Sequence, residues 1–297
     1  MYVQQPVQGG IQPVGGTQIR RQDLLNQRRF AMRIDEAGRR RSRALRQGGA
    51  PSIKRGDGLE LDEIRAFQQG DNPRHIDWRV TARSGDLHTK QYRQENETPV
   101  YLLLDLSPSM NFGSVHSFKS VLAAQLAALI GWSYRRSRRR LGAVVRINGE
   151  LHGIRAGEDD ALMHLFAIAC GAVQGARMQA ERFADALNLF AQLCHGGADA
   201  YIISDFQGLD EDCDTPLTLL RRYGGFAIRV RDALEILPPN DSLPIRTGSG
   251  KSWVSRGRLA QHLEELDARF EHAAMQGALN VQEFCTGEDL SAVKAVL

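Results

Sequence analysis

Two apolar runs that contain an aspartate at their carboxyl ends constrain the fold of this 297-residue chain more than any other feature. The first reads VYLLLDLS at residues 100–107, and the second reads AYIISDF at residues 200–206. Apolar runs without alternation are typical of strands buried on both faces, as in parallel sheets. Because helical patterns separate these runs, the sequence predicts an α/β fold with a mostly parallel sheet flanked by helices.

Strand and helix patterns continue to alternate along the rest of the chain. The segment FKSVLAAQLAALIGWSYRR at 118–136 is apolar nearly all round, which predicts a helix with much of its surface buried. The short runs LGAVVRIN and LHGIR predict a pair of strands that turn at Gly149. Further helices are expected at 159–173, 181–194, 216–224 and 256–276, and further strands at 225–232 and 280–286.

Three segments divide the chain. Residues 1–50 form a basic N-terminal segment, in which 1–18 are rich in glycine, proline and glutamine and 22–47 carry a basic helical pattern. Residues 51–99 contain short alternating segments separated by turn signals such as GDNP and SGD, which predict a small β-rich module. Residues 100–297 then form the α/β domain.

The composition favours a soluble, cytoplasmic protein. The net charge of +3 is too small to imply a partner, and the four cysteines are scattered without a CxxC pair, which suits a reducing compartment. The first residues contain no apolar core of signal-peptide length, and the apolar stretch at 121–132 is too short to span a bilayer.

Oxygen-bearing side chains gather at the ends of the two apolar runs. Asp105, Ser107 and Ser109 alternate in DLSPS, and Asp205 ends the second run. Ligands of open α/β sheets bind outside the carboxyl ends of the strands, and the N–H groups of the following helix are expected to point there too. Two carboxylates and two hydroxyls are hard donors that suit Mg²⁺ or Mn²⁺. The alternative explanation is that these residues only cap a helix.

The same residues resemble two known patterns. D-x-S-x-S after an apolar strand, with a later strand ending in Asp, resembles the metal-ion-dependent adhesion site of von Willebrand factor A domains. The preceding module and this site together resemble the signature of the bacterial family catalogued as domain of unknown function 58, over residues 45–240. The matching residues outside the metal site are Gly56, Gly58, Glu60, Arg65, Gly70, Asp71, Arg74, Asp77, Trp78, Thr81, Arg83 and Glu95.

The resemblance implies a von Willebrand A-like (Rossmann-like) fold with a β-rich insertion ahead of it. It also implies that Asp105, Ser107, Ser109 and Asp205 hold the cation, which leaves a coordination position for a carboxylate of a partner protein. Members of this family are usually encoded beside MoxR-type AAA+ ATPases and are thought to work with them as adaptors. The chain is therefore expected to be a non-enzymatic adaptor without catalytic residues.

One ligand of the related sites is missing from this sequence. Those sites usually take a Thr from the loop before the helix that precedes the second Asp-bearing strand, and here that loop reads QGARMQAERFADAL. Gln179 or Glu181 would substitute for this Thr, or a water would fill the gap, or the affinity would be low.

The GDNPRHIDW run at 70–78 carries several charged residues for which we expect a structural role. Asp-Asn-Pro is a turn signal, and an arginine between acidic residues more often ties down a loop by charge-assisted hydrogen bonds. Trp78 is expected to anchor the module on the main domain, and partner docking is the second explanation. Together with Arg65 and Arg83 on either side of this run, the residues of this structural or docking motif are Gly70, Asp71, Arg74, Asp77 and Trp78.

Alternatives from other functional classes stay open. The arginine clusters RRSRRR at 135–140 and GRRRSRALRQ at 38–47 could follow a nucleic-acid backbone or anionic lipids, although they lack interleaved aromatics. Metal ligands could also activate water in a hydrolase. The segment TGSGKS at 247–252 resembles the end of a phosphate-binding loop, but Ile245 replaces the required glycine, so we expect a surface loop there.

Overall fold

The computed structural model describes residues 13–32, 55–68, 73–93, 98–137, 139–171, 181–195, 197–238, 243–247, 250–254 and 256–295. Contacts divide the chain into two compact units, one of residues 1–39 with 98–297 and one of residues 40–97. The N-terminal segment was expected to be separate, but its described part, 13–32, groups with the α/β unit. None of the helices in the described residues has the length and apolar character needed to cross a membrane.

The α/β unit contains a six-stranded sheet in the order β10-β7-β6-β3-β4-β5. All neighbouring strands are parallel except β5, which runs antiparallel to β4. The predicted mostly parallel α/β fold, which is Rossmann-like, is therefore confirmed. The strands are β3 (Val100–Leu106), β4 (Leu141–Ile147), β5 (Glu150–Ile154), β6 (Asp199–Ser204), β7 (Phe226–Arg231) and β10 (Asn280–Cys285).

The predicted turn between β4 and β5 is also confirmed. Asn148 and Gly149 connect the two strands with φ angles of 53° and 79°. Two consecutive residues with positive φ are what a tight two-residue hairpin turn needs, and Asn-Gly is the preferred pair for it. This turn adds the antiparallel strand at one edge of the sheet.

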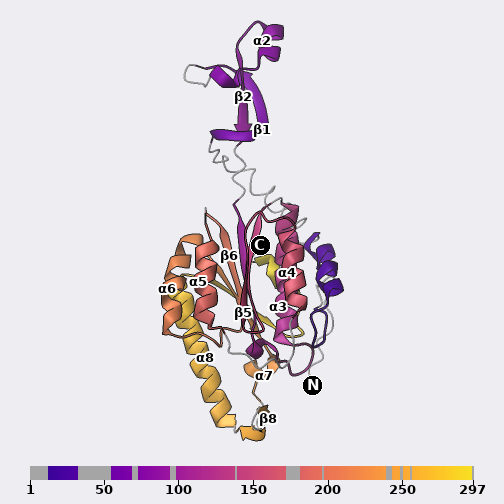
Figure 1. Ribbon diagram of the computed structural model, residues 1–297, viewed down its shortest axis with the longest axis vertical. Helices are drawn as coiled ribbons and strands as arrows, with labels where there is room; N and C mark the ends of the chain where they lie inside the picture. The colour runs from indigo at the N-terminus through magenta and orange to yellow at the C-terminus, as the bar shows by residue number, and fades with distance from the viewer. Residues whose placement is uncertain are drawn as a thin grey trace. The chain divides into compact units, whose positions relative to one another are not determined.

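Helices cover both faces of the sheet, as Figure 1 shows. One core joins a helix over residues 21–32, α3 and α4 to one face of the sheet, and the other joins α5, α6 and α8 to the opposite face. Every residue of β3 and β4 is buried, as expected for strands between two helical layers. The helices are α3 (Lys119–Arg136), α4 (Ala161–Cys170), α5 (Phe183–Leu193), α6 (Asp214–Leu220), α7 (Ala233–Ile236) and α8 (Arg256–Gly277), and the 3-10 turns of the unit are η2 (Pro108–Met110), η3 (Glu211–Cys213), η4 (Arg221–Tyr223) and η5 (Leu290–Ala295).

The strand order reverses between β3 and β6. The chain leaves β3 toward β4 on one side, and it leaves β6 toward β7 on the other side, although β3 and β6 are hydrogen-bonded neighbours. At such a position the two outgoing connections separate and leave a crevice at the carboxyl ends of the strands, where ligands of this fold class bind. Asp105 is the penultimate residue of β3, and Asp205 follows β6 directly.

The second unit contains β1 (Arg55–Ala66) and β2 (His88–Arg93), paired antiparallel, with η1 (Pro73–His75) and α2 (Trp78–Ser84) between them. The alternation in HIDWRVTARS suggested an extended segment, but most of it is helical. Asp77 caps α2 by accepting hydrogen bonds from the backbone of Arg79 and Val80, and Gly85 ends the helix with φ 82°. Capping and termination thus outweigh the alternation signal.

One further sequence expectation differs from the structure, and another is described only in part. Most of the expected surface loop at 247–252 belongs instead to two paired antiparallel strands, β8 (Leu243–Thr247) and β9 (Gly250–Val254), while residues 248–249 lie outside the described residues. The predicted basic helix at 22–47 is observed over residues 21–32, and the rest of that segment lies outside the described residues. Within 21–32, Leu24 and Ala31 are buried against the α/β unit, which gives this helix its apolar side.

Candidate functional site

Asp105 lies at the buried end of β3 and is held from three sides. Its register partner on β4 is Arg146, whose Nη1 atom lies 3.3 Å from Asp105 Oδ1. The hydroxyl of Ser204 on β6 donates to Asp105 Oδ2 over 2.7 Å, and the backbone N–H of Ser107 donates to Oδ1 over 3.0 Å. Both oxygens of this carboxylate are therefore engaged by the protein.

Burial raises the pKa of Asp105 above its ordinary value. The Arg146 guanidinium opposes this shift, the Asp205 carboxylate adds to it, and the hydrogen bonds from Ser204 and Ser107 oppose it without overcoming burial. A carboxyl group in such surroundings favours an additional positive charge nearby, because a cation stabilises its ionised form.

The two serine hydroxyls connect Asp105's loop to Asp205. Ser107 Oγ lies 3.2 Å from Ser109 Oγ, and Ser109 Oγ donates to Asp205 Oδ1 over 3.2 Å. The structure therefore brings the four predicted metal-site residues together. The side chain of Ser107 makes no capping hydrogen bond to the 3-10 turn η2, whereas Asp105 and Asp205 each accept a hydrogen bond from the backbone N–H two residues further along the chain.

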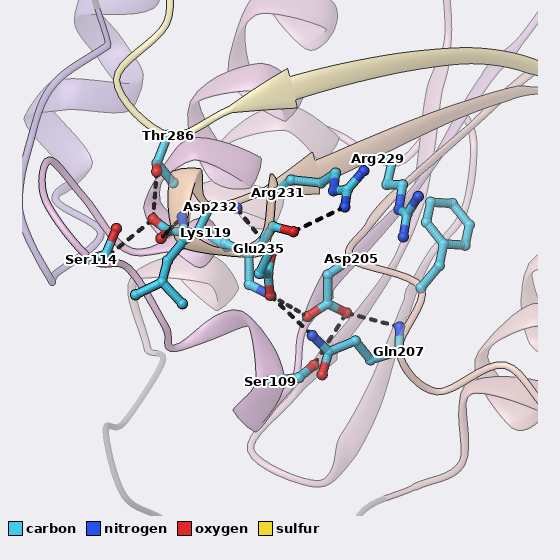
Figure 2. Close-up of polar contacts among 12 residues, drawn as sticks. Ser109, Ser114, Lys119, Asp205, Gln207, Arg229, Arg231, Asp232, Glu235 and Thr286 are labelled. Carbon is cyan, nitrogen blue, oxygen red and sulfur yellow. Dashed lines mark hydrogen bonds and ion pairs between the residues drawn. The ribbon is translucent and has the colours of Figure 1, made fainter. Parts of the chain in front are cut away.

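Asp205 divides its two oxygens between different partners, as the dashed lines in Figure 2 show. Oδ1 accepts from the Ser109 hydroxyl and from the backbone N–H of Gln207 over 3.1 Å. Oδ2 accepts from Lys119 Nζ over 2.8 Å. One side of the carboxylate thus faces the hydroxyls, and the other side faces an ammonium group.

Lys119 is the first residue of α3, and its side chain is fully buried. Besides Asp205 it binds Glu235 Oε1 of α7 over 2.6 Å. Burial alone would lower the pKa of Lys119, but the carboxylates of Asp205 and Glu235 outweigh it and raise the pKa above the ordinary value. The ammonium group therefore remains charged at neutral pH.

The helix expected at 118–136 begins at Lys119, after η2 and the loop 111–118. The backbone N–H of Lys119 donates to Phe112 O over 2.8 Å, so it is used within this loop. The backbone N–H of Lys119 therefore does not point at the site, contrary to what was expected for the start of this helix. The lysine side chain, and not the start of the helix, brings positive charge to Asp205.

The proposed substitutes for the missing Thr have different outcomes. Gln179 lies outside the described residues. The side chain of Glu181 is exposed, and its backbone carbonyl accepts hydrogen bonds from Arg146 Nε and Nη2 over 2.9 and 2.7 Å. Glu181 thus helps to hold the guanidinium that pairs with Asp105, and it does so through its backbone carbonyl.

The motif residues of the second unit are described only in part. Arg65 pairs in register with Thr89 between β1 and β2, and Arg74 and Arg83 are exposed. Asp77 has a structural role as the cap of α2, and Trp78 starts that helix with a side chain that is 67% exposed. The expected anchoring by Trp78 stays a prediction. Gly70 and Asp71 lie outside the described residues.

The arginine cluster at 135–140 is engaged in part within the α/β unit. Arg135 forms an ion pair with Asp160 at 2.5 Å, and Arg139 forms one with Asp199 at 2.6 Å. Arg139 also donates to the backbone carbonyl of Thr98 over 2.6 Å. The other cluster, at 38–47, lies outside the described residues.

Sequence reasoning missed four side chains that complete the site, namely Lys119, Arg146, Ser204 and Glu235. A signal existed for two of them. Lys119 is a charged residue at the start of an otherwise apolar helix, where the helix dipole disfavours a cation, and Arg146 interrupts an apolar strand. Buried charges are retained only with partners, so both positions indicated an acidic counterpart nearby.

Solved structures that match part of this chain include two proteins from Bacteroides. BatB from Bacteroides thetaiotaomicron is 15% identical with a TM-score of 0.44, and the match covers 67% of this chain and 95% of that chain. An aerotolerance-related membrane protein from Bacteroides fragilis is 16% identical with a TM-score of 0.42, over 67% of this chain and 96% of that chain.

Curated relatives share sequence with part of this chain, and the relatives themselves are longer than the part that matches. Uncharacterized protein Rv1480 of Mycobacterium tuberculosis and uncharacterized protein Mb1516 of Mycobacterium bovis are each 31% identical over 189 residues, or 63% of this chain. The matched region spans 57% of the length of these relatives. The family model described as protein of unknown function DUF58 matches residues 63–248, which is more than half of the chain. The chain therefore belongs to the DUF58 family.

Proposed function

We propose that the α/β unit is a von Willebrand A-like protein-interaction module that holds Mg²⁺ or Mn²⁺ with Asp105, Ser107, Ser109 and Asp205. When bound, the cation supplies an open coordination position for a carboxylate of a partner protein. In this proposal the chain is a cytoplasmic adaptor without catalytic residues that works with a MoxR-type AAA+ ATPase.

The series of oxygen atoms at the strand ends is the observation that carries this proposal. Ser107 Oγ, Ser109 Oγ and Asp205 Oδ1 follow one another at 3.2 Å and 3.2 Å. Mg²⁺ binds oxygen at about 2.0–2.1 Å in octahedral geometry, so neighbouring ligands of one ion lie about 3.0 Å apart. The donor types and their spacing therefore fit a small divalent cation.

The partners of the two aspartates indicate which atoms remain for a cation. Both oxygens of Asp105 already accept from Arg146, Ser204 or the Ser107 backbone, which favours a contact through water. Asp205 Oδ1 faces the serine hydroxyls, while Oδ2 is taken by Lys119. Ser107, Ser109 and Asp205 Oδ1 would thus bind the ion directly, and Asp105 would bind it through water.

Co-purification with the candidate ATPase tests the proposal. The immobilised chain is expected to retain a MoxR-type ATPase in Mg²⁺ and to release it in EDTA, and Ser109→Ala is expected to retain it at least about tenfold less, the effect of losing about 1.4 kcal/mol. Ser137→Ala is the matched control, because this hydroxyl only donates to Ser133 O near the end of α3. Circular dichroism verifies that both variants are folded.

Two outcomes would contradict the proposal. Retention that is equal in Mg²⁺ and EDTA, and equal for Ser109→Ala and wild type, would remove the cation from the interaction. Binding of DNA or anionic vesicles that falls with salt and is unchanged in Ser109→Ala, without ATPase retention, would favour the arginine clusters as the functional surface.

A further inference from the structure

Lys119 places a fixed positive charge inside the proposed cation site. Its ammonium group is fully buried and binds Asp205 Oδ2 at 2.8 Å and Glu235 Oε1 at 2.6 Å. The ring of Phe112 lies over it, with its centroid 5.8 Å from Nζ. A lysine at the start of a helix opposes the helix dipole, and a buried ammonium group loses its hydration, so this position has two costs.

The contacts around Lys119 join the candidate site to a separate segment of the chain. Glu235 Oε1 also accepts from Gln207 Nε2 over 3.1 Å, and Glu235 Oε2 accepts from the backbone N–H of Asp232 over 2.9 Å. The segment after β7 is thereby tied to the residues that follow β6. These bonds fix the ammonium group beside Asp205, so it is not free to leave when a second cation approaches.

We infer that Lys119 shares Asp205 with the divalent cation and thereby makes binding of the cation and of a partner's carboxylate cooperative. The inference rests on the proposed function and names a specificity-determining residue for it. In this arrangement Lys119 stays bound to Asp205 Oδ2, and the divalent cation binds Asp205 Oδ1, which lies beside the serine hydroxyls.

The balance of charge among the ion-paired side chains of the site explains why the cation and the partner's carboxylate would bind cooperatively. Asp105, Asp205 and Glu235 supply three negative charges, and Arg146 and Lys119 supply two positive charges. A divalent cation added to this group is repelled by Lys119 and leaves an excess of positive charge in a poorly solvated place. A carboxylate from outside offsets that excess, so each ligand raises the affinity for the other.

Removing the positive charge of Lys119 and removing the negative charge of Glu235 are expected to have opposite effects on the affinity for a divalent cation. Lys119→Met removes the repulsion, so the variant binds Mn²⁺ more tightly, by about tenfold or more, and needs no carboxylate to do so. Glu235→Gln removes a negative charge and leaves Lys119 with Asp205 alone, so the variant binds Mn²⁺ more weakly than wild type. Simple loss of structure would weaken binding in both variants.

Calorimetric titration with MnCl₂, with and without saturating acetate, tests the inference on the full chain. In wild type, acetate is expected to raise the Mn²⁺ affinity by at least about fivefold, the lower end of typical couplings between sites. Acetate has no such effect on Lys119→Met. The matched controls are Lys294→Met on η5 and Glu271→Gln on α8, because both side chains are exposed and neither is a partner of Lys119 in its ion pairs.

The possible results separate this inference from the proposed function. Equal Mn²⁺ affinity and equal acetate dependence in wild type and Lys119→Met would overturn the role of Lys119 and leave the docking proposal intact. Tight binding by Lys119→Met with none by wild type, even in acetate, would overturn the cooperativity and the proposed docking together. If Lys119→Met does not fold, Glu235→Gln decides: weaker binding than in Glu271→Gln supports the inference, and unchanged binding overturns it.

Discussion

Asp232 joins three segments that lie far apart in the sequence. It is fully buried, and its carboxylate accepts hydrogen bonds from the backbone of Ser114 over 3.0 Å, the backbone of Leu234 over 3.1 Å and the hydroxyl of Thr286 over 2.6 Å. Burial would raise the pKa of Asp232, but the hydrogen bonds from Ser114, Thr286 and Leu234 outweigh it and lower the pKa below the ordinary value. Thr286 therefore stabilises the ionised form.

Thr286→Val is expected to lower the free energy of unfolding at pH 7 by about 1.5–3 kcal/mol, because a hydrogen bond to a charged group is lost. The lowered pKa makes this contribution complete above the ordinary aspartate pKa of about 3.9, and it declines as the pH falls through the lower folded-state value. Urea unfolding at pH 7 and near pH 3 measures it. The control is Thr218→Val, whose hydroxyl lies on the exposed side of α6. A difference between Thr286→Val and wild type that is the same at both pH values would contradict the assignment.

The loop 111–118 illustrates the constraints at the scale of an element. A Cβ atom on Gly113 would lie 2.0 Å from the carbonyl oxygen of Ser117, so only glycine fits there. Gly16 pairs with the same loop by donating to His116 O and accepting from the backbone N–H of Phe118, each over 3.0 Å. The loop that separates the serines from Lys119 is thus held tightly from both sides.

Gly113→Ala is expected to destabilise the protein by about 1–3 kcal/mol, as overpacking does, and to weaken Mn²⁺ binding because Lys119 and Ser109 lie at the two ends of this region. Denaturant unfolding and calorimetry measure the two effects. Gly257→Ala is the control, since a Cβ atom there meets nothing within 4 Å and alanine is the better helix former. Equal stability of Gly113→Ala and wild type would show that the loop readily adjusts.

Elements with a strong pattern could be predicted, and elements decided by local hydrogen bonds could not. The apolar helix α3 and the Asn148-Gly149 turn follow from periodicity and from turn chemistry. The helix α2 was missed because the Asp77 cap and Gly85 determine it, against an alternating pattern. At the site, the four oxygen-bearing residues follow from strand ends, whereas Glu235 comes from a short helix that no sequence signal connects to Asp205.

At the scale of the whole molecule, the contacts define two units that are interleaved in the sequence. The unit of residues 40–97 is inserted between the N-terminal helix and β3 of the α/β unit. Among the residues that the structure describes, both hydrophobic cores of the α/β unit consist of residues from 13–32 and 98–297. The α/β unit therefore has the buried surface that an independently folding domain needs.

Replacing residues 40–97 with a flexible glycine-serine linker is expected to leave the α/β unit folded. Its thermal transition, followed by circular dichroism, should remain cooperative and lie within a few degrees of that of the full chain. The same chain should still bind Mn²⁺, because the proposed ligands all belong to this unit. A product without a cooperative transition would show that the two units depend on each other for stability.

Electron paramagnetic resonance of Mn²⁺ tests the central claim most directly, which is that the serine hydroxyls and two aspartates form one cation site. In acetate buffer the wild-type chain is expected to bind one Mn²⁺, with a spectrum altered from that of the free ion. Ser107→Ala is expected to reduce this affinity at least about tenfold, while Ser137→Ala binds as wild type does. An unaltered Mn²⁺ spectrum with wild type, or equal binding by wild type and Ser107→Ala, would contradict the account.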